Sequence, residues 1–222
     1  MTAKRMDSAT RRASIIEAAK GVFARYGLEG ARTQQIATAA GVSEALLFRH
    51  FPSKTHIYRA VLRQVILDQN ETLRRSPRAE PGTNGLLHMI RALMAHSLQG
   101  SAAHNAEGLR MVVGSIAGDG HYARLVYRRA MRLTNMREVL DAAVADGGLT
   151  GTPIHPNDAT AFIEHVSTMV MMARCHGQSA VEYAADDQRV LADAVLFCAR
   201  GLGIAEARVT AFLADEGLLA PA

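Results

Sequence analysis

The sequence predicts an all-α protein, and three observations support this fold class. Apolar residues make up 49% of the 222 residues, which is ample for the core of one large domain or two modest ones. These residues recur at helical spacing along most of the chain, and no segment shows the alternation of a half-buried strand. Glycine, proline and capping residues divide the chain into helical units. We therefore expect helices that pack on helices.

The first part of the chain predicts four helices. Gly27 follows the first apolar stripe and is expected to end that helix as a C′ glycine. Thr33, Ser43 and Ser53 are the expected N-caps of the next three helices, because their hydroxyls can accept a hydrogen bond from exposed amides. The expected ranges are 11–26, 34–40, 44–50 and 54–74.

The remaining residues predict a second set of helices. The segment 76–85 is rich in proline, glycine and polar residues and is expected to be a linker. A long turn is expected over 146–157. The expected helices cover 85–100, 106–116, 120–146, 158–176 and 187–202, with a weaker one over 205–214.

Positive charge is concentrated near the N-terminus. Residues 1–54 hold nine Lys and Arg against four Asp and Glu, whereas the remaining residues are close to neutral. This asymmetry favours a polyanionic partner, because phosphate neutralisation dominates affinity for nucleic acids. A solvated basic tail is the alternative interpretation. We expect a DNA-binding domain over 1–54 and a second domain over 55–222.

The segment 33–51 has the composition of a helix-turn-helix. Ala37 is small where the two helices would cross, and Gly41 stands where the turn is expected to need a positive φ. Ser43 can cap the helix 44–50, whose positive end then points toward phosphate. An ordinary helical hairpin is the alternative. The local basic excess and the polar residues favour DNA binding.

Residues 11–66 resemble the N-terminal domain of the TetR (tetracycline-repressor) family. The resemblance covers about a quarter of the chain. Beyond it, only the helical pattern and the two final apolar helices are similar to that family. The matching positions are Ile15 through Phe23, Tyr26-Gly27, Thr33 through Ala37, Gly41 through Ser43, Leu47 through Phe51, Ser53-Lys54 and Ile57-Tyr58.

The resemblance implies roles for individual residues. The helix 44–50 is expected to enter the major groove and to present Glu44, Ala45, Leu46 and Arg49 to base edges. Phe48 replaces the tyrosine that is usual in the family, so the phosphate contact of that hydroxyl is lost. The residues expected to contact the DNA backbone are Thr33, Ser43, His50 and Lys54, and Gln34 is a further polar candidate.

The resemblance implies that the second domain binds a small effector and forms a homodimer. The helices 158–176 and 187–202 are apolar over more than one face, which fits a four-helix interface between two subunits. A buried core pair is the alternative. The expected interface residues are Phe162, Val166, Val170, Leu191, Val195 and Cys198.

The effector is expected to be hydrophobic, because the chain has 10 Met and no Trp and methionine adapts to irregular apolar shapes. Methionine is also ordinary core filler. The expected pocket residues are Met89, Leu93, His96, Met111, Met136, Phe162, His165 and Met169.

Several other classes of protein are disfavoured. We find no catalytic motif, no metal-ligand spacing among the histidines and no sign of a cofactor. Cys175 and Cys198 are expected to be buried thiols, and no membrane span or signal peptide is found. We therefore expect a cytoplasmic regulator that is not an enzyme. A regulator without an effector, or an unrecognised helical enzyme, is the alternative.

The expected mechanism is ligand-controlled repression. A dimer would hold two recognition helices about 34–36 Å apart and bind a palindromic operator. Effector binding would shift the helix 54–74 and release the DNA. Activation in place of repression remains open, and so do the identity of the effector and the operator sequence.

Overall fold

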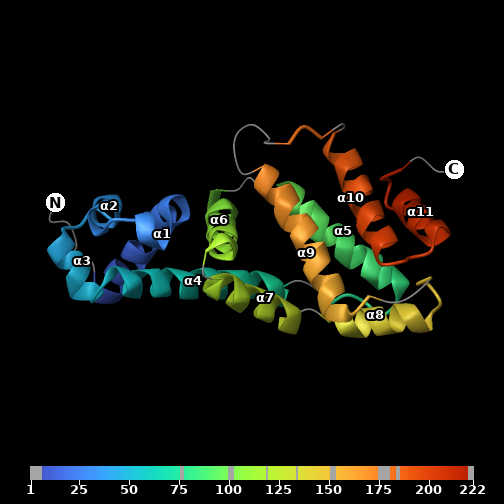
Figure 1. Cartoon of the computed structure of the whole chain (residues 1–222), viewed down its shortest axis with the longest axis horizontal. Coiled ribbons are helices and arrows are strands. Elements are labelled where there is room, and N and C mark those ends of the chain that lie inside the picture. The colour runs from blue at the N-terminus through green and yellow to red at the C-terminus, as the bar shows by residue number, and fades with distance from the viewer. Residues whose placement is uncertain are drawn as a thin grey trace. The chain divides into compact units, whose positions relative to one another are not determined.

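The computed structural model describes residues 7–75, 78–99, 103–118, 120–133, 135–150, 154–174, 181–183 and 186–219. In this part of the chain the regular elements are helices (Figure 1), and an isolated bridge joins Leu149 to Ile204. The all-α prediction is confirmed. The helices are α1 (Ser8–Gly30), α2 (Thr33–Ala39), α3 (Glu44–His50), α4 (Lys54–Arg75), α5 (Thr83–Gln99), α6 (Ala103–Ala117), α7 (His121–Leu133), α8 (Met136–Ala145), α9 (Pro156–Ala173), α10 (Asp187–Gly201) and α11 (Glu206–Asp215).

The chain forms two compact units. Unit 1 consists of Met1–Arg75 and Glu107–Val126, and unit 2 consists of Ser76–Ala106 and Tyr127–Ala222. This division by packing differs from the expected boundary after residue 54, because α4 packs along α1. None of the helices in the described part of the chain is long and apolar enough to cross a membrane.

The core of unit 1 lies between α1 and α4. Ile15 of α1 and Val61 of α4 are fully buried, and Phe23 packs edge-on against Tyr58 with ring centroids 5.0 Å apart. Gly27 interrupts α1 with a φ of 66°. The predicted helix end at this glycine is confirmed, although a further turn extends to Gly30.

Helices α6 and α7 also contribute to unit 1. The Ser115 hydroxyl near the end of α6 accepts hydrogen bonds from the amides of Tyr122 and Ala123 in α7, both at 3.1 Å. These bonds satisfy amides in the first turn of α7, which have no partner within their own helix.

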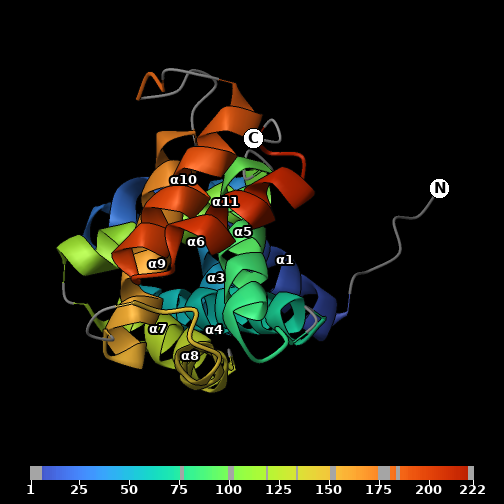
Figure 2. The same cartoon turned by 90° about the vertical axis from the view of Figure 1, so that its right-hand side faces the viewer.

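Helix α5 is the central element of unit 2 and contacts α8, α9, α10 and α11 (Figures 1 and 2). It begins at Thr83, inside the predicted linker, because Asp146 binds this end of the helix. One Asp146 carboxylate oxygen accepts from the Thr83 amide at 2.8 Å, and the other accepts from its hydroxyl at 2.6 Å. The apolar core around α5 includes Leu86, Leu87, Ile90, Met94, Val139, Ile163, Val195 and Leu213.

The single helix predicted over 120–146 is wrong. The segment forms α7 and α8, and Asn135 between them has a non-helical backbone. Its side-chain amide donates to the Ala79 carbonyl oxygen at 2.8 Å. Periodicity cannot reveal this break, because it depends on a partner 56 residues away in the sequence.

The capping predictions have mixed outcomes. Ser43 and Ser53 accept from amides in the first turns of α3 and α4, as predicted. The prediction for Thr33 is wrong, because Thr33 is the first residue of α2. The N-cap is Arg32, whose amide donates to the Gln35 side-chain oxygen at 2.9 Å.

The two cysteines lie in different circumstances. Cys198 is buried as predicted, and this burial raises the pKa of its thiol to about 11. Cys175 lies outside the described residues.

Candidate nucleic-acid interface

Helices α2 and α3 are joined by a tight turn. Gly41 has a φ of 64°, as predicted, and this left-handed conformation strains any residue with a Cβ. The Val42 amide donates to the Ala37 carbonyl at 2.9 Å. Ile36, Ala37 and Leu47 are buried. The turn and the burial of these three side chains fix how α3 is oriented on the rest of unit 1.

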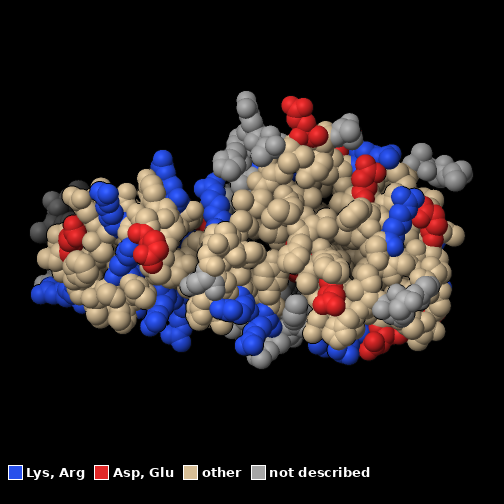
Figure 3. All heavy atoms as spheres, viewed as in Figure 1, with Lys and Arg blue, Asp and Glu red and all other residues tan. Residues whose placement is uncertain are grey.

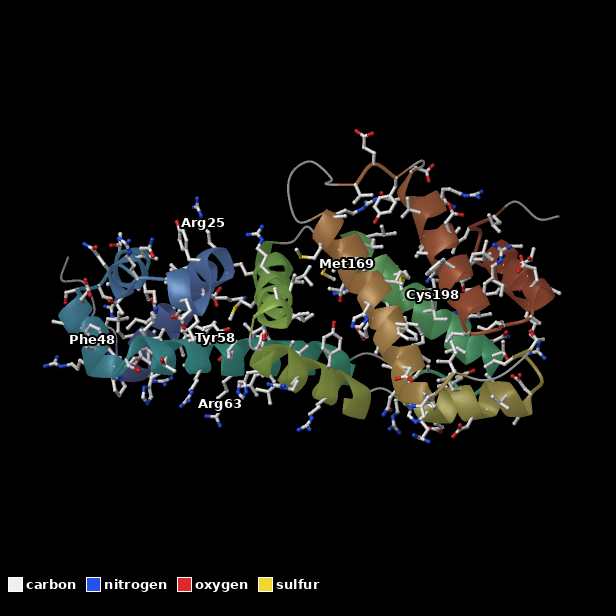
Figure 4. All side chains as sticks on the ribbon, in the orientation of Figure 1. Arg25, Phe48, Tyr58, Arg63, Met169 and Cys198 are labelled. Carbon is white, nitrogen blue, oxygen red and sulfur yellow. The ribbon has the colours of Figure 1, made fainter. Side chains whose placement is uncertain are left out.

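Helix α3 exposes acidic, apolar and basic side chains to solvent. Glu44, Ala45, Phe48 and Arg49 are exposed, whereas Leu46 is half-buried. The exposed fraction of Phe48 is 45%, which is high for an aromatic side chain (Figure 4). The predicted base-contacting residues other than Leu46 are therefore accessible on α3.

Glu44 at the start of α3 is held by α2. The Thr33 hydroxyl donates to the Glu44 carboxylate at 2.9 Å. The predictions gave these two residues separate contacts with a base and with a phosphate. In this structure they bind each other, so a contact with DNA would compete with their hydrogen bond. Both roles remain predictions.

Lys54 has structural partners that the sequence did not reveal. Its ammonium donates to the carbonyl oxygens of Glu29 at 3.2 Å and Ala31 at 3.0 Å. These oxygens lie at the end of α1, where helical carbonyls lack partners within the helix. Two of the three donors of the ammonium are thus used within unit 1, and the predicted phosphate contact would use the third.

The other predicted DNA-contacting residues lie on α2, at the N-cap of α3 and at the last residue of α3. Ser43 and Gln34 are exposed, and His50 is half-buried. Several exposed arginines of unit 1 were not predicted as contacts, since their positions on the surface depend on how α1, α2 and α4 pack. They are Arg25, Arg32, Arg59 and Arg63, and Figure 3 shows how prominent Lys and Arg are over these helices.

Arg12 belongs to α1 and not to a solvated tail. Its guanidinium lies 4.5 Å from the centroid of the Phe51 ring, a distance at which a cation is attracted by the ring. Arg11 is also helical, whereas Arg5 lies outside the described residues.

The predicted pocket residues are divided between the two units and differ in burial. Met111 is buried in unit 1, whereas Met136 is buried in the core of unit 2. Phe162 and Met169 are 57% and 54% exposed, and His96 and His165 are exposed as well. Met89 and Leu93 pack against the core of unit 2. These positions are predicted from residue type alone, and residue type does not indicate which face of a helix a residue occupies.

A polar groove is present in unit 2. Its volume is about 540 Å³, and of the predicted pocket residues only Met136 lines it. Charged and amide side chains dominate the lining, which includes Arg78, Asn135, Arg137, Glu138, Asp141 and Asn157.

The predicted dimer residues divide into two groups. Phe162 is exposed, and Val166 and Leu191 are half-buried. The others, Val170, Val195 and Cys198, are buried within unit 2 and have little surface for a partner. The alternative of a buried core pair therefore applies to these three. Phe197 was not among the predicted interface residues, and it is 68% exposed on α10.

Within the part of the chain that the structure describes, no three His, Cys, Asp or Glu side chains gather as metal ligands do.

Comparison with known proteins finds a family model and relatives that match the N-terminal segment. Residues 15–61 match the model of the family described as "Bacterial regulatory proteins, tetR family". The HTH-type transcriptional regulator RutR of Escherichia coli is 45% identical over 56 residues, which are 25% of this chain and 26% of RutR. The repressor AcnR of Corynebacterium diphtheriae is 30% identical over 86 residues, which are 39% of this chain and 41% of AcnR. The matches thus span well under half of these relatives.

Solved structures are similar over most of the chain. A TetR-like transcriptional regulator from Rhodococcus sp. RHA1 has a TM-score of 0.62 and 18% identity, covering 89% of this chain and 98% of that one. AibR, solved with isovaleryl coenzyme A and operator DNA, has a TM-score of 0.61 and 15% identity, covering 84% and 97%. At these identities the likeness shows the fold alone. The segment that matches the tetR family model, residues 15–61, contains α2, the turn at Gly41 and α3.

Proposed function

We propose that this chain is a ligand-responsive transcriptional regulator that binds palindromic operator DNA as a dimer. Repression is the form we favour, because AcnR, which matches residues of this chain at 30% identity, is named a repressor. Activation uses the same kind of domain and is the alternative. We expect a cytoplasmic protein without catalytic activity.

The geometry of α3 carries this proposal. The helix is capped by Ser43 and held at a fixed angle by the turn at Gly41. It exposes Arg49 in its last turn, and an arginine in a groove can bind a guanine through two hydrogen bonds. The exposed Phe48 ring can pack against a thymine methyl group, since it has no hydroxyl for a phosphate.

Selection of random DNA duplexes by the purified full chain tests the proposal. We expect enrichment of a palindrome with half-sites about one helical turn apart. R49A should weaken binding to that palindrome about 10- to 100-fold, the loss expected for one bidentate base contact. Absence of any enriched sequence at low salt would refute the proposal.

R63A is the matched control for R49A. It removes the same charge from an exposed position on α4, away from α3 in the sequence. Loss of a phosphate-directed charge weakens binding to all sequences alike. We therefore expect R63A to enrich the same palindrome as the wild type. If both variants lost enrichment equally, α3 would not be the element that reads the sequence.

We propose that the dimer forms through the exposed apolar side chains of α9 and α10. Phe162, Met169 and Phe197 are each more than half exposed, which is unusual for such large apolar groups unless a partner covers them. F197D should shift the protein from dimer to monomer in sedimentation velocity. The same change at the exposed position Ile116 in unit 1 should not.

A ligand that binds one spacing of the two α3 helices better than another would change operator affinity by population shift. AibR was solved with both a coenzyme A thioester and DNA. Release of the selected palindrome on addition of a ligand, followed by fluorescence anisotropy, is the direct measurement.

A further inference from the structure

Helix α9 carries polar side chains along one side that faces the interior of unit 2. Glu164, Ser167 and Thr168 are spaced at i, i+3 and i+4, so they share one side of the helix. Ser167 is buried, and Glu164 and Thr168 are half-buried. The neighbouring core is otherwise built from aliphatic side chains. Buried polar groups destabilise a protein unless they find hydrogen-bond partners.

Ser167 has such a partner. Its hydroxyl binds that of Ser97 on α5, and Ser97 in turn donates to the Leu93 carbonyl oxygen at 2.9 Å. These two hydroxyls are therefore satisfied within unit 2 and have no need of a ligand.

Tyr127 lies against the same side of α9 and is not satisfied in this way. Its ring contacts the His165 imidazole edge-on, with centroids 5.5 Å apart. Its hydroxyl oxygen is buried, and the Thr168 hydroxyl that acts on it does not reach normal hydrogen-bond geometry. Leaving a buried hydroxyl without a partner costs about 1–3 kcal/mol.

The surroundings of this hydroxyl are rich in oxygen atoms. Burial raises the pKa of Tyr127, the Thr168 hydroxyl lowers it and the Glu164 carboxylate raises it, so both groups act on the phenol. Burial also raises the pKa of Glu164, and it is the only cause of that shift among the described residues. The carboxyl group therefore sits in a dehydrated position, and no described cation offsets its charge.

We propose that Glu164, Tyr127 and Thr168 bind the ammonium group of a small amine. The carboxylate is a pure acceptor, the two hydroxyls can accept, and a primary ammonium supplies three donors with a positive charge. The Tyr127 ring adds an attractive surface for a cation. An anion would be repelled by Glu164, and a neutral alcohol would supply one donor without charge. The inference rests on the proposed regulatory function only where it names this amine as the effector.

Isothermal titration calorimetry on the full chain without DNA tests the site. The probe is 4-phenylbutylamine, and 4-phenylbutan-1-ol is its uncharged counterpart. We expect saturable binding of the amine and binding of the alcohol at least tenfold weaker. Equal affinity for both compounds, or no binding of the amine, would overturn the inference.

Variants locate the binding. E164Q should weaken amine binding tenfold or more, and T168V, which keeps the side-chain shape, should weaken it several-fold. E182Q makes the same chemical change at an exposed position of unit 2 and should bind the amine as the wild type does. Equal binding by E164Q and wild type would overturn the inference. The comparison of amine with alcohol on the wild type decides the matter if E164Q does not fold.

Failure of this inference is distinguishable from failure of the proposed function. The DNA selection uses no ligand, and the calorimetry uses no DNA. An enriched palindrome together with no amine binding would leave the regulator intact and remove this site. Release of that palindrome by the amine in wild type, and not in E164Q, would identify the amine as the effector.

Discussion

Removal of the Glu107 carboxylate is expected to destabilise unit 1 more than its exposure suggests. Glu107 lies on α6, and one of its oxygens is 4.0 Å from the Lys20 ammonium on α1. The Lys20 side chain is only 4% exposed, whereas that of Glu107 is 30% exposed. E107Q would leave the ammonium buried without a countercharge, and an isolated buried charge is strongly unfavourable.

The magnitude follows from the geometry of the pair. At 4 Å and an effective dielectric constant of 20, the attraction is about 4 kcal/mol before desolvation is subtracted. Breaking a fully buried pair costs roughly 3–5 kcal/mol. Glu107 is partly in water, and a lysine chain can bend toward solvent, so we expect a loss of about 2 kcal/mol for E107Q. K20M should cost less than E107Q, because methionine leaves no buried charge.

Urea unfolding of E107Q, K20M and the double variant, followed by circular dichroism, measures this coupling. The double variant should be more stable than the sum of the two single losses predicts. E29Q, at an exposed position of α1, should change stability by less than about 0.5 kcal/mol, as surface substitutions do. Strict additivity, together with a loss no larger than that of E29Q, would refute the reasoning.

Three further predictions concern other parts of the chain. G41A should lower stability by about 1–2 kcal/mol in thermal unfolding, because alanine is strained at a φ of 64°, and an unchanged melting temperature would contradict this. F48Y should raise operator affinity several-fold in fluorescence anisotropy by restoring a phosphate contact, with the salt dependence unchanged because a neutral hydroxyl releases no counterion; equal or weaker binding would argue against that contact. The Thr83 hydroxyl and amide lower the pKa of Asp146, so its contribution to stability is present above the ordinary carboxyl pKa and is lost as pH falls through the lowered value. In urea unfolding at a series of pH values, D146N should therefore lose less stability than the wild type as pH falls. An equal loss in both proteins would exclude this role of Asp146.

The accuracy of the sequence predictions follows the range of the interactions involved. Gly41 and Ser43 were predicted correctly because turn and cap geometry depend on neighbouring residues. Thr33 is an exception, because the cap of α2 is completed by the neighbouring Gln35 side chain and the sequence still predicted the wrong residue. The carbonyl oxygens bound by Lys54 belong to residues 23 and 25 positions away in the sequence, and no local pattern contains that information.

The second unit shows the same limit more clearly. Apolar periodicity shows that α9 is broadly apolar, but it does not tell which residues meet the core and which meet solvent. Val170 is buried, whereas Met169 beside it is 54% exposed. Methionine content therefore suggested a hydrophobic pocket from residues whose burial ranges from the core to the surface.

The candidate ligand site in unit 2 is inferred from burial in the structure and not from a sequence pattern. No sequence feature marks Tyr127 and Glu164 as site residues, since neither residue type is rare and their spacing matches no motif. Their significance comes from burial, because a dehydrated carboxylate and an unpaired hydroxyl are unfavourable unless something else binds them. A protein selected only for stability would replace Glu164 with an apolar residue at little cost. If E164Q proves more stable than the wild type and also loses the amine, the carboxylate is retained for binding at the expense of stability.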